Sequence, residues 1–316
     1  MALEEQILRF YLKVFSFLLI FVIYFFYVFL VREINLKNNY FFIKKNENYK
    51  KIIENNITDN NANLFIYEFT LRFLLFTKNE IHFGKFIFEK KPTYYKILKK
   101  IILPSNYYNK ITIIEGWSKN DLNNILLNNF DNYFELKYNK IIADTYVFSN
   151  GISFLTFKKQ LDKRFLLIKN KFKDHHLLKK YSFDQIMIIG SLLEREGIND
   201  DDKRKIYSVI MNRLKINMKL QIDATVIFAL TGGERDLQRK LSYADLKFDN
   251  PFNTYINYGL PPRPISYVGH KTIELIFEDY KTDYLFYFYN SFENRHIFSL
   301  NYKDHLKRLN EYRSKK

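Results

Sequence analysis

The sequence of 316 residues contains no cysteine, which excludes disulfide bonds and thiolate chemistry but identifies no cellular compartment. It also lacks an arginine-rich cluster and any recognised nucleic-acid-binding motif. No nucleic-acid partner is therefore expected, despite the formal net charge of +16. The adjacent His175 and His176 lack the spacing of metal ligands, and we expect neither a metal nor another cofactor. With 47% hydrophobic residues, the chain is expected to fold over most of its length.

Proline is scarce too: the chain has only six, and four of them lie within residues 250–265, NPFNTYINYGLPPRPI. Because proline fixes the backbone angle φ, this stretch predicts a rigid loop. Such a loop would hold Asn253, Thr254 and Tyr255 in place to line a cleft. A long connection without a function is the alternative.

Charge is absent from Val14–Val31, VFSFLLIFVIYFFYVFLV. As a helix this run is long enough to cross a bilayer, and its aromatic content suits a membrane anchor. A cleaved signal peptide is the alternative, but no small-residue cleavage site follows Val31. Basic residues occur on both sides of the run, so the positive-inside rule barely decides its orientation.

Residues 184–197, DQIMIIGSLLEREG, predict an apolar helix that contains two glutamates. On a wheel of 3.6 residues per turn, Glu196 falls inside the aliphatic stripe. Glu194 falls on the other side, where it would face solvent or pair with a lysine. Burial and the C-terminal end of the helix both raise the pKa of a carboxyl group, as a general acid requires. Gly197 would then end the helix as a C′ residue.

Short strands and helices follow one another along the rest of the chain and predict an α+β fold. Strands are expected at 39–43, 85–88, 110–114, 283–289 and 295–298, the last two as a hairpin. Helices are expected at 49–55, 93–102, 119–127, 154–175, 203–214, 272–280 and 302–313. Thr93 and Ser118 are expected to cap the second and third of these at their N-terminal ends.

Several spaced motifs resemble those of the endolytic murein transglycosylases, the YceG-like family of membrane-anchored cell-wall enzymes. The matching stretches are SLLEREG (191–197), VIMNRLKINMKLQIDATVIFAL (209–230), NPFNTYINYGLPPRPI (250–265), TDYLFYF (282–288) and RHIFS (295–299). Weaker matches upstream are GKFIF, IIEGWSKNDL and ADTY. The sequence departs from the family pattern at Ala224, where proline is usual, and at Arg263, where glycine is common.

The resemblance implies three parts. These are a cytoplasmic tip with a transmembrane anchor over residues 1–33, a small LysM-like α+β subdomain over 34–137 and a mixed α+β catalytic domain over 138–316. It implies a single-pass protein of the cell inner membrane with its catalytic domain in the periplasm. The implied partners are peptidoglycan glycan strands and the membrane, with peptidoglycan synthases as further candidates.

The resemblance also implies a lytic transglycosylase, a carbon–oxygen lyase that cleaves the MurNAc–GlcNAc bond of nascent peptidoglycan and ends glycan elongation. The catalytic acid of the family is the second glutamate of its E-x-E motif, which is Glu196 here. It would protonate the bridging oxygen and then accept the proton of the MurNAc C6 hydroxyl, whose oxygen closes on C1 as a 1,6-anhydro end. Supporting or substrate-binding roles are expected for Asn212, Arg213, Gln221, Asp223, Asn253, Thr254, Tyr255 and His296.

Two other functions stay open. A muramidase-type hydrolase on the same fold would use Asp223 as a second acid and water as the nucleophile. A non-catalytic scaffold of the cell-wall synthesis machinery would bind peptidoglycan without cleaving it. For Asn212 and Arg213, a place on a helix surface or in an internal salt bridge is the alternative to a role in the site.

Overall fold

The computed structural model of the protein describes residues 2–44, 47–76, 80–105, 107–149, 151–234 and 237–315. The chain forms two compact units: unit 1 holds residues 1–110 and 147–153, and unit 2 holds residues 111–146 and 154–316. It passes between them within β5 (Tyr108–Thr112) and β7 (Thr145–Ser149), two strands that pair with each other. The mixed α+β class agrees with the sequence prediction. The division at residues 34 and 138 stays a prediction.

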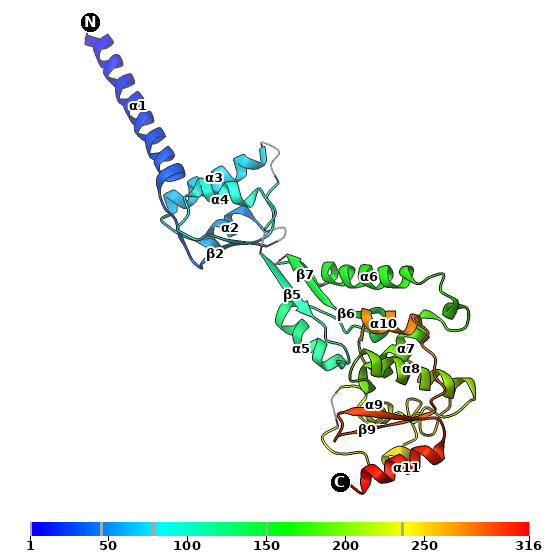
Figure 1. Ribbon diagram of the computed structural model, residues 1–316. Coiled ribbons are helices and arrows are strands. Elements are labelled where there is room, and N and C mark those ends of the chain that lie inside the picture. The colour runs from blue at the N-terminus through cyan, green and yellow to red at the C-terminus, as the bar shows by residue number, and fades with distance from the viewer. Residues whose placement is uncertain are drawn as a thin grey trace. The chain divides into compact units, whose positions relative to one another are not determined.

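In the residues that the structure describes, unit 1 combines two small antiparallel sheets with the α-helices α1, α2, α3 and α4, which Figure 1 labels. In chain order its elements are α1 (Ala2–Phe26), the π-helical turn η1 (Tyr27–Val31), β1 (Asn35–Leu36), β2 (Tyr40–Ile43), α2 (Tyr49–Asn56), β3 (Ile57–Thr58), α3 (Asn61–Phe76), β4 (Gly84–Ile87) and α4 (Tyr94–Ile101). Strand β1 pairs with β3, and β2 pairs with β4. The core includes Phe41, Tyr67, Phe86 and Tyr94, all fully buried.

Most of these elements lie where the sequence predicts them, but α3 is missing from the prediction. The helix prediction for α4 is confirmed together with its cap, because the Thr93 hydroxyl accepts the N–H of Lys96. In α3 the apolar residues do not form a single stripe. Phe65, for example, is exposed while Ile66 is buried. Because apolar residues occur on both sides of α3, the sequence lacks the 3.6-residue hydrophobic periodicity on which a helix prediction depends.

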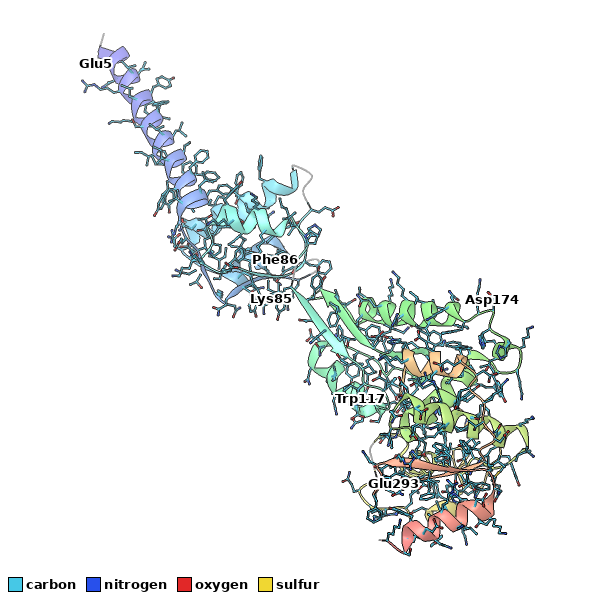
Figure 2. The ribbon with its side chains drawn as sticks, viewed as in Figure 1. Glu5, Lys85, Phe86, Trp117, Asp174 and Glu293 are labelled. Atoms are coloured by element: carbon cyan, nitrogen blue, oxygen red, sulfur yellow. The ribbon has the colours of Figure 1, made fainter. Side chains whose placement is uncertain are left out.

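The uncharged run near the N-terminus forms one long helix, as expected. Glu5–Val31 is long and apolar enough to cross a membrane, and few of its residues are buried within the protein. Figure 2 shows its side chains projecting on all sides from Glu5 onward. Its last turns are different, because Val28 is fully buried and Phe25 and Phe29 pack on the core of unit 1.

Unit 2 surrounds one buried helix, α7. Its elements after β5 are α5 (Lys119–Asn129), η2 (Tyr138–Lys140), β6 (Ile142–Ala143), β7, α6 (Phe154–Lys171), η3 (His176–Lys179), α7 (Phe183–Glu196), α8 (Asp200–Lys215), α9 (Asp223–Thr231), η4 (Asp245–Lys247), β8 (Val268–Gly269), α10 (His270–Phe277), β9 (Phe286–Asn290), β10 (Arg295–Ser299) and α11 (Tyr302–Arg313). Strand β6 pairs in parallel with β8, and β9 forms the predicted hairpin with β10.

Helix α7 begins with a capping box between Ser182 and Gln185, and α8, α9, α10 and β8 pack around it. The close approach of β8 requires a residue without a side chain at position 190. A Cβ atom on Gly190 would lie 2.6 Å from Cγ1 of Val268. This packing fixes the C-terminal end of α7, where both glutamates lie.

Candidate active site

Glu196 is the last residue of α7 and is half-buried. Gly197 follows it as the C-cap residue, with φ −82° and ψ 134°, so the prediction that Gly197 is the C′ residue is wrong. The glycine is needed for space instead: a Cβ atom there would lie 2.3 Å from Cγ of Lys203 and 3.2 Å from the carbonyl oxygen of Leu193. This close contact sets the turn from α7 into α8 immediately after the carboxyl group.

The pKa of Glu196 is raised from its ordinary value of 4.5 to about 7, and burial is the largest cause. The negative charge of Asp223 raises this pKa further. Three groups act in the opposite direction, namely the Tyr287 hydroxyl, the charge of His296 and the backbone N–H of Ala224 at the start of α9. The carboxyl group is therefore able to hold a proton near neutral pH and is also stabilised after losing it.

Tyr287 on β9 is the direct partner of Glu196, since its hydroxyl donates to Oε2 of Glu196 over 3.1 Å. Sequence reasoning missed this tyrosine. Burial and the neighbouring carboxyl group keep the pKa of Tyr287 well above 10, so it remains a donor. The alternating sequence of the strand, FYFYN, is the pattern that could have identified Tyr287. Phe286 and Phe288 form ring contacts with His305 of α11, whereas Tyr287 and Tyr289 contact His296 on the other side of the strand.

His296, which the sequence predicted as a site residue, is on β10 and lies beside Tyr287. Its ring centre is 5.4 Å from that of Tyr287, and its Nδ1 is 2.7 Å from Oδ2 of Asp202 at the start of α8. Both side chains of the Asp202–His296 pair are less than a tenth exposed. Asp202 was not among the predicted site residues, because nothing in the sequence relates it to a histidine on a distant strand. The pair holds the hairpin against α8.

Asp223 and Tyr255 form a second polar pair next to the acid. Asp223 is the first residue of α9 and is exposed, and its Oδ1 accepts a hydrogen bond of 2.5 Å from the Tyr255 hydroxyl. Burial raises the pKa of Tyr255 most, and the hydrogen bond to Asp223 and the charges of Asp223 and Glu196 raise it further. A pocket lined by Arg195 and Ala224 also borders this part of α9.

Two other predicted residues, Asn253 and Thr254, are buried and organise the loop. The Asn253 amide donates to the carbonyl oxygens of Leu246 and Phe248. The Thr254 hydroxyl accepts the N–H of Ile222, and its carbonyl oxygen accepts the N–H of Gln221. These contacts hold the start of α9, whose Ala224 N–H faces Glu196.

Gln221 is exposed and adopts φ +49°, a left-handed conformation that is uncommon outside glycine. Its backbone N–H is bound to Thr254 over 3.1 Å, so the turn before α9 is fixed. Its side chain is therefore presented at the turn that leads into Asp223.

Asn212 and Arg213 bind backbone carbonyls on the segment before β9. The Asn212 amide donates to the carbonyl oxygens of Thr282 and Tyr284, over 2.7 and 2.9 Å. Arg213 is buried and donates to the carbonyl oxygens of Leu285 and Leu220. Both residues therefore fix the strand that carries Tyr287, and their predicted supporting role stays a prediction.

Glu194 does not face solvent, so that part of the sequence prediction is wrong, while its alternative of a lysine partner is confirmed. The Glu194 side chain is 2% exposed, and its Oε2 lies 2.5 Å from Nζ of Lys203. Its Oε1 accepts the N–H of Gly269 over 2.9 Å. Glu194 thus joins α7, α8 and β8.

Replacing Tyr287 by phenylalanine is expected to raise the pKa of Glu196, because the lost hydroxyl bond favours the charged form. A hydrogen bond to a charged group contributes about 1.5–3 kcal/mol, which corresponds to a shift of about one to two pH units. For glycan-strand cleavage, kcat/KM is expected to decline where Glu196 loses its proton, and the pH of this decline should rise by the same amount. Tyr289→Phe is the matched control, since the Tyr289 hydroxyl binds Asn294 in the turn of the same hairpin, away from Glu196.

Replacing Glu196 by glutamine is expected to stabilise the fold at high pH. The pKa of Glu196 is raised on folding, so the folded chain holds a proton between pH 4.5 and about 7 that the unfolded chain lacks. Stability therefore falls as the pH rises through this window, by about 3 kcal/mol in all. Denaturation midpoints of the two proteins should agree near pH 4 and differ most above pH 7. Equal midpoints at pH 8 would contradict the raised pKa.

Comparison with known proteins identifies the family. The model of the YceG-like family matches residues 41–311, which is most of the chain. The chain belongs to the YceG-like family. A crystal structure of a yceG-like protein from Listeria monocytogenes shares the fold, with a TM-score of 0.53 and 23% identity over 86% of this chain and 99% of that one.

Curated relatives match a smaller part of the chain. A Bacillus subtilis (strain 168) protein named endolytic murein transglycosylase is 39% identical over 137 residues, which are 43% of this chain and 37% of that protein. A protein of the same name from Streptococcus pneumoniae (strain ATCC BAA-255 / R6) is 28% identical over 157 residues, 48% of this chain and 27% of that protein. The matched regions thus span well under half the length of these relatives.

Proposed function

We propose that this member of the YceG-like family is an endolytic lytic transglycosylase that cleaves the MurNAc–GlcNAc bond of peptidoglycan strands. The observation that carries the proposal is the environment of Glu196, a half-buried carboxyl group whose pKa is raised to about 7 and which contacts Tyr287. A group that first donates and then accepts a proton is most effective when its pKa is near the working pH. Two relatives named endolytic murein transglycosylase support the choice of substrate.

Glu196 would first protonate the oxygen that bridges the two sugars, and the bond from that oxygen to C1 of MurNAc would break. The resulting carboxylate is favoured by the Tyr287 hydroxyl and by the N–H of Ala224. It would then remove the proton of the C6 hydroxyl while that oxygen bonds to C1. The proton given in the first step is thus recovered in the second, and a 1,6-anhydro end forms without water.

The proposal also assigns a location in the membrane and a role to each part of the chain. Glu5–Val31 would serve as a single-pass anchor in the inner membrane, with unit 2 in the periplasm. Residues 34–137 would form a LysM-like subdomain, and residues 138–316 would form the catalytic domain. Cleavage close to the membrane would end the elongation of nascent strands, with peptidoglycan synthases as partners.

A muramidase-type hydrolase is the second candidate, and the place of Asp223 favours it. The Asp223 carboxylate lies close enough to raise the pKa of Glu196 and is itself held by the Tyr255 hydroxyl. As a general base it would activate water, and the product would carry a reducing end.

Mass spectrometry of purified peptidoglycan digested by the full chain distinguishes the two reactions. We expect 1,6-anhydroMurNAc ends, formed inside strands as well as at their termini. Reducing MurNAc ends would instead identify the hydrolase. Unchanged peptidoglycan, from a protein that still sediments with the polymer, would identify a binding scaffold.

A further inference from the structure

An apolar face of helix α3 in unit 1 is exposed. Phe65, Phe69 and Phe73 are spaced by one turn and lie on the same side of the helix, and they are 70%, 56% and 61% exposed. The other side of α3, which carries Ile66 and Tyr67, packs in the core. Exposed helix faces are normally polar, so three phenylalanines in a row mark a contact with an apolar partner.

Part-buried polar contacts join the start of α3 to the last turns of the candidate membrane span. The Tyr24 hydroxyl donates to Oδ1 of Asn63 over 2.8 Å, and the Asn63 amide donates to Asp59 over 3.1 Å. Asp59 also pairs with Arg32 over 2.8 Å, and Tyr67 donates to its other oxygen. Asn63 is fully buried, and the Asp59 side chain is only 7% exposed. The span and α3 are therefore parts of one folded unit.

The length of the candidate span indicates how deep in the bilayer its contact with α3 lies. A helix of 27 residues, Glu5–Val31, is about 40 Å long, whereas the hydrocarbon core of a bilayer is about 30 Å thick. This excess of about 10 Å lies at the C-terminal end of the span, Tyr24–Val31, because Phe25 and Phe29 pack on the core of unit 1. Tyr24–Val31 therefore belongs in the headgroup layer, while Arg9 and Lys13 near the other end extend their charges toward the opposite headgroups. Since α3 begins beside Tyr24, its first turn lies at the same depth. In Figure 1, α3 lies on the side of unit 1 from which α1 extends, and β2 lies on the far side.

Neighbouring side chains have the chemistry of a membrane interface. The Tyr95 ring on α4 is 47% exposed and lies 6.0 Å from that of Phe29 in η1. Lys99 is exposed one turn further along α4, and Arg72, which pairs with Glu68 on α3, has a side chain that is 58% exposed. Aromatic rings and basic groups are favoured where acyl chains meet phosphate headgroups.

We propose that α3 lies in the headgroup layer of the bilayer, with Phe65, Phe69 and Phe73 in contact with acyl chains. Unit 1 is then docked on the membrane that α1 spans. A lipid bilayer fits better than a second copy of the chain, because the helix that carries the exposed face is bonded near its start to the span itself. The inference rests on the membrane anchor of the proposed function and extends it from a single helix to a docked unit.

Fluorescence quenching by lipid tests this contact in the full chain. The chain has one tryptophan, Trp117 in unit 2, so Trp117→Phe gives a silent background. Phe69→Trp in that background would be reconstituted into nanodiscs of phosphatidylethanolamine and phosphatidylglycerol, with or without bromine on the acyl chains. We expect about a twofold loss of fluorescence with bromine, because interfacial helices bury their apolar face by roughly 5–10 Å.

Ile87→Trp is the matched control, because Ile87 is an apolar residue of the same unit, 42% exposed, on β4. It should be quenched little. Equal quenching at both positions, or none at position 69, would overturn the inference. Two chains per nanodisc, cross-linked through α3, would also overturn it and identify a second copy as the partner.

Two further measurements separate this inference from the proposed function. Extraction with alkaline carbonate tests whether α1 anchors the protein, independently of α3. Peptidoglycan cleavage by the Phe65→Ser, Phe69→Ser, Phe73→Ser variant in detergent should equal that of the original chain, because these side chains lie outside unit 2. Normal cleavage and anchoring without quenching at position 69 would reject the docking of α3 alone.

Discussion

Glu196→Gln is expected to reduce the rate of anhydro-end formation by about 10²–10⁴-fold, the usual contribution of a general acid–base group. Glutamine keeps the shape of the side chain but neither donates a proton to the bridging oxygen nor accepts one from the C6 hydroxyl. Both steps of the proposed reaction therefore slow together. The measurement is the release of anhydro-muropeptides from purified peptidoglycan, followed by mass spectrometry over time.

The matched control is Asp201→Asn, which also removes one carboxylate close in sequence to the site. The Asp201 side chain is 68% exposed and pairs with Lys205 one turn away on α8, so its loss should leave activity unchanged. For the original protein, kcat/KM should fall as the pH rises above about 7, where Glu196 loses its proton. Full activity of the Glu196→Gln protein would remove Glu196 from the mechanism.

Glu194→Ala is expected to lower the free energy of unfolding of unit 2 by about 3–5 kcal/mol, as for other buried ion pairs that lose one partner. The substitution leaves Lys203, which is 15% exposed, without its carboxylate, and it leaves the N–H of Gly269 without an acceptor. Chemical denaturation of the full chain, followed by far-ultraviolet circular dichroism, measures the change. The glutamate two residues before the proposed catalytic acid is thus expected to act on stability.

A double variant separates lost charge pairing from lost packing. Glu194→Gln combined with Lys203→Met removes both charges while the amide oxygen still accepts the N–H of Gly269. It should recover most of the lost stability, because neutral side chains of similar volume often replace a buried ion pair without cost. An unchanged denaturation midpoint in Glu194→Ala would show that the pair contributes nothing to the fold.

Local patterns in the sequence predicted several secondary-structure elements and the candidate acid of the site. The alternating FYFYN and RHIFS segments predicted the hairpin, and Thr93 and Ser118 predicted the starts of two helices. The spacing of Glu196 in an apolar helix indicated an acid with a raised pKa, and the structure places such a group at the end of α7. Each of these features depends on residues within one or two turns of each other, so a linear pattern contains them.

Other features depend on contacts between distant segments, and only the tertiary structure decided them. A helical wheel gives the direction of Glu194 relative to the aliphatic stripe of its helix. Because α7 is buried on nearly every side, this direction does not predict whether the side chain is exposed. The hydroxyl of Tyr287 reaches Glu196 across 91 positions of sequence, and Asp202 reaches His296 across 94. The sequence by itself determined which helix carries the acid. The packing of α8, α9 and the hairpin around that helix decided which neighbours tune its pKa, because burial and hydrogen bonding belong to the assembled fold.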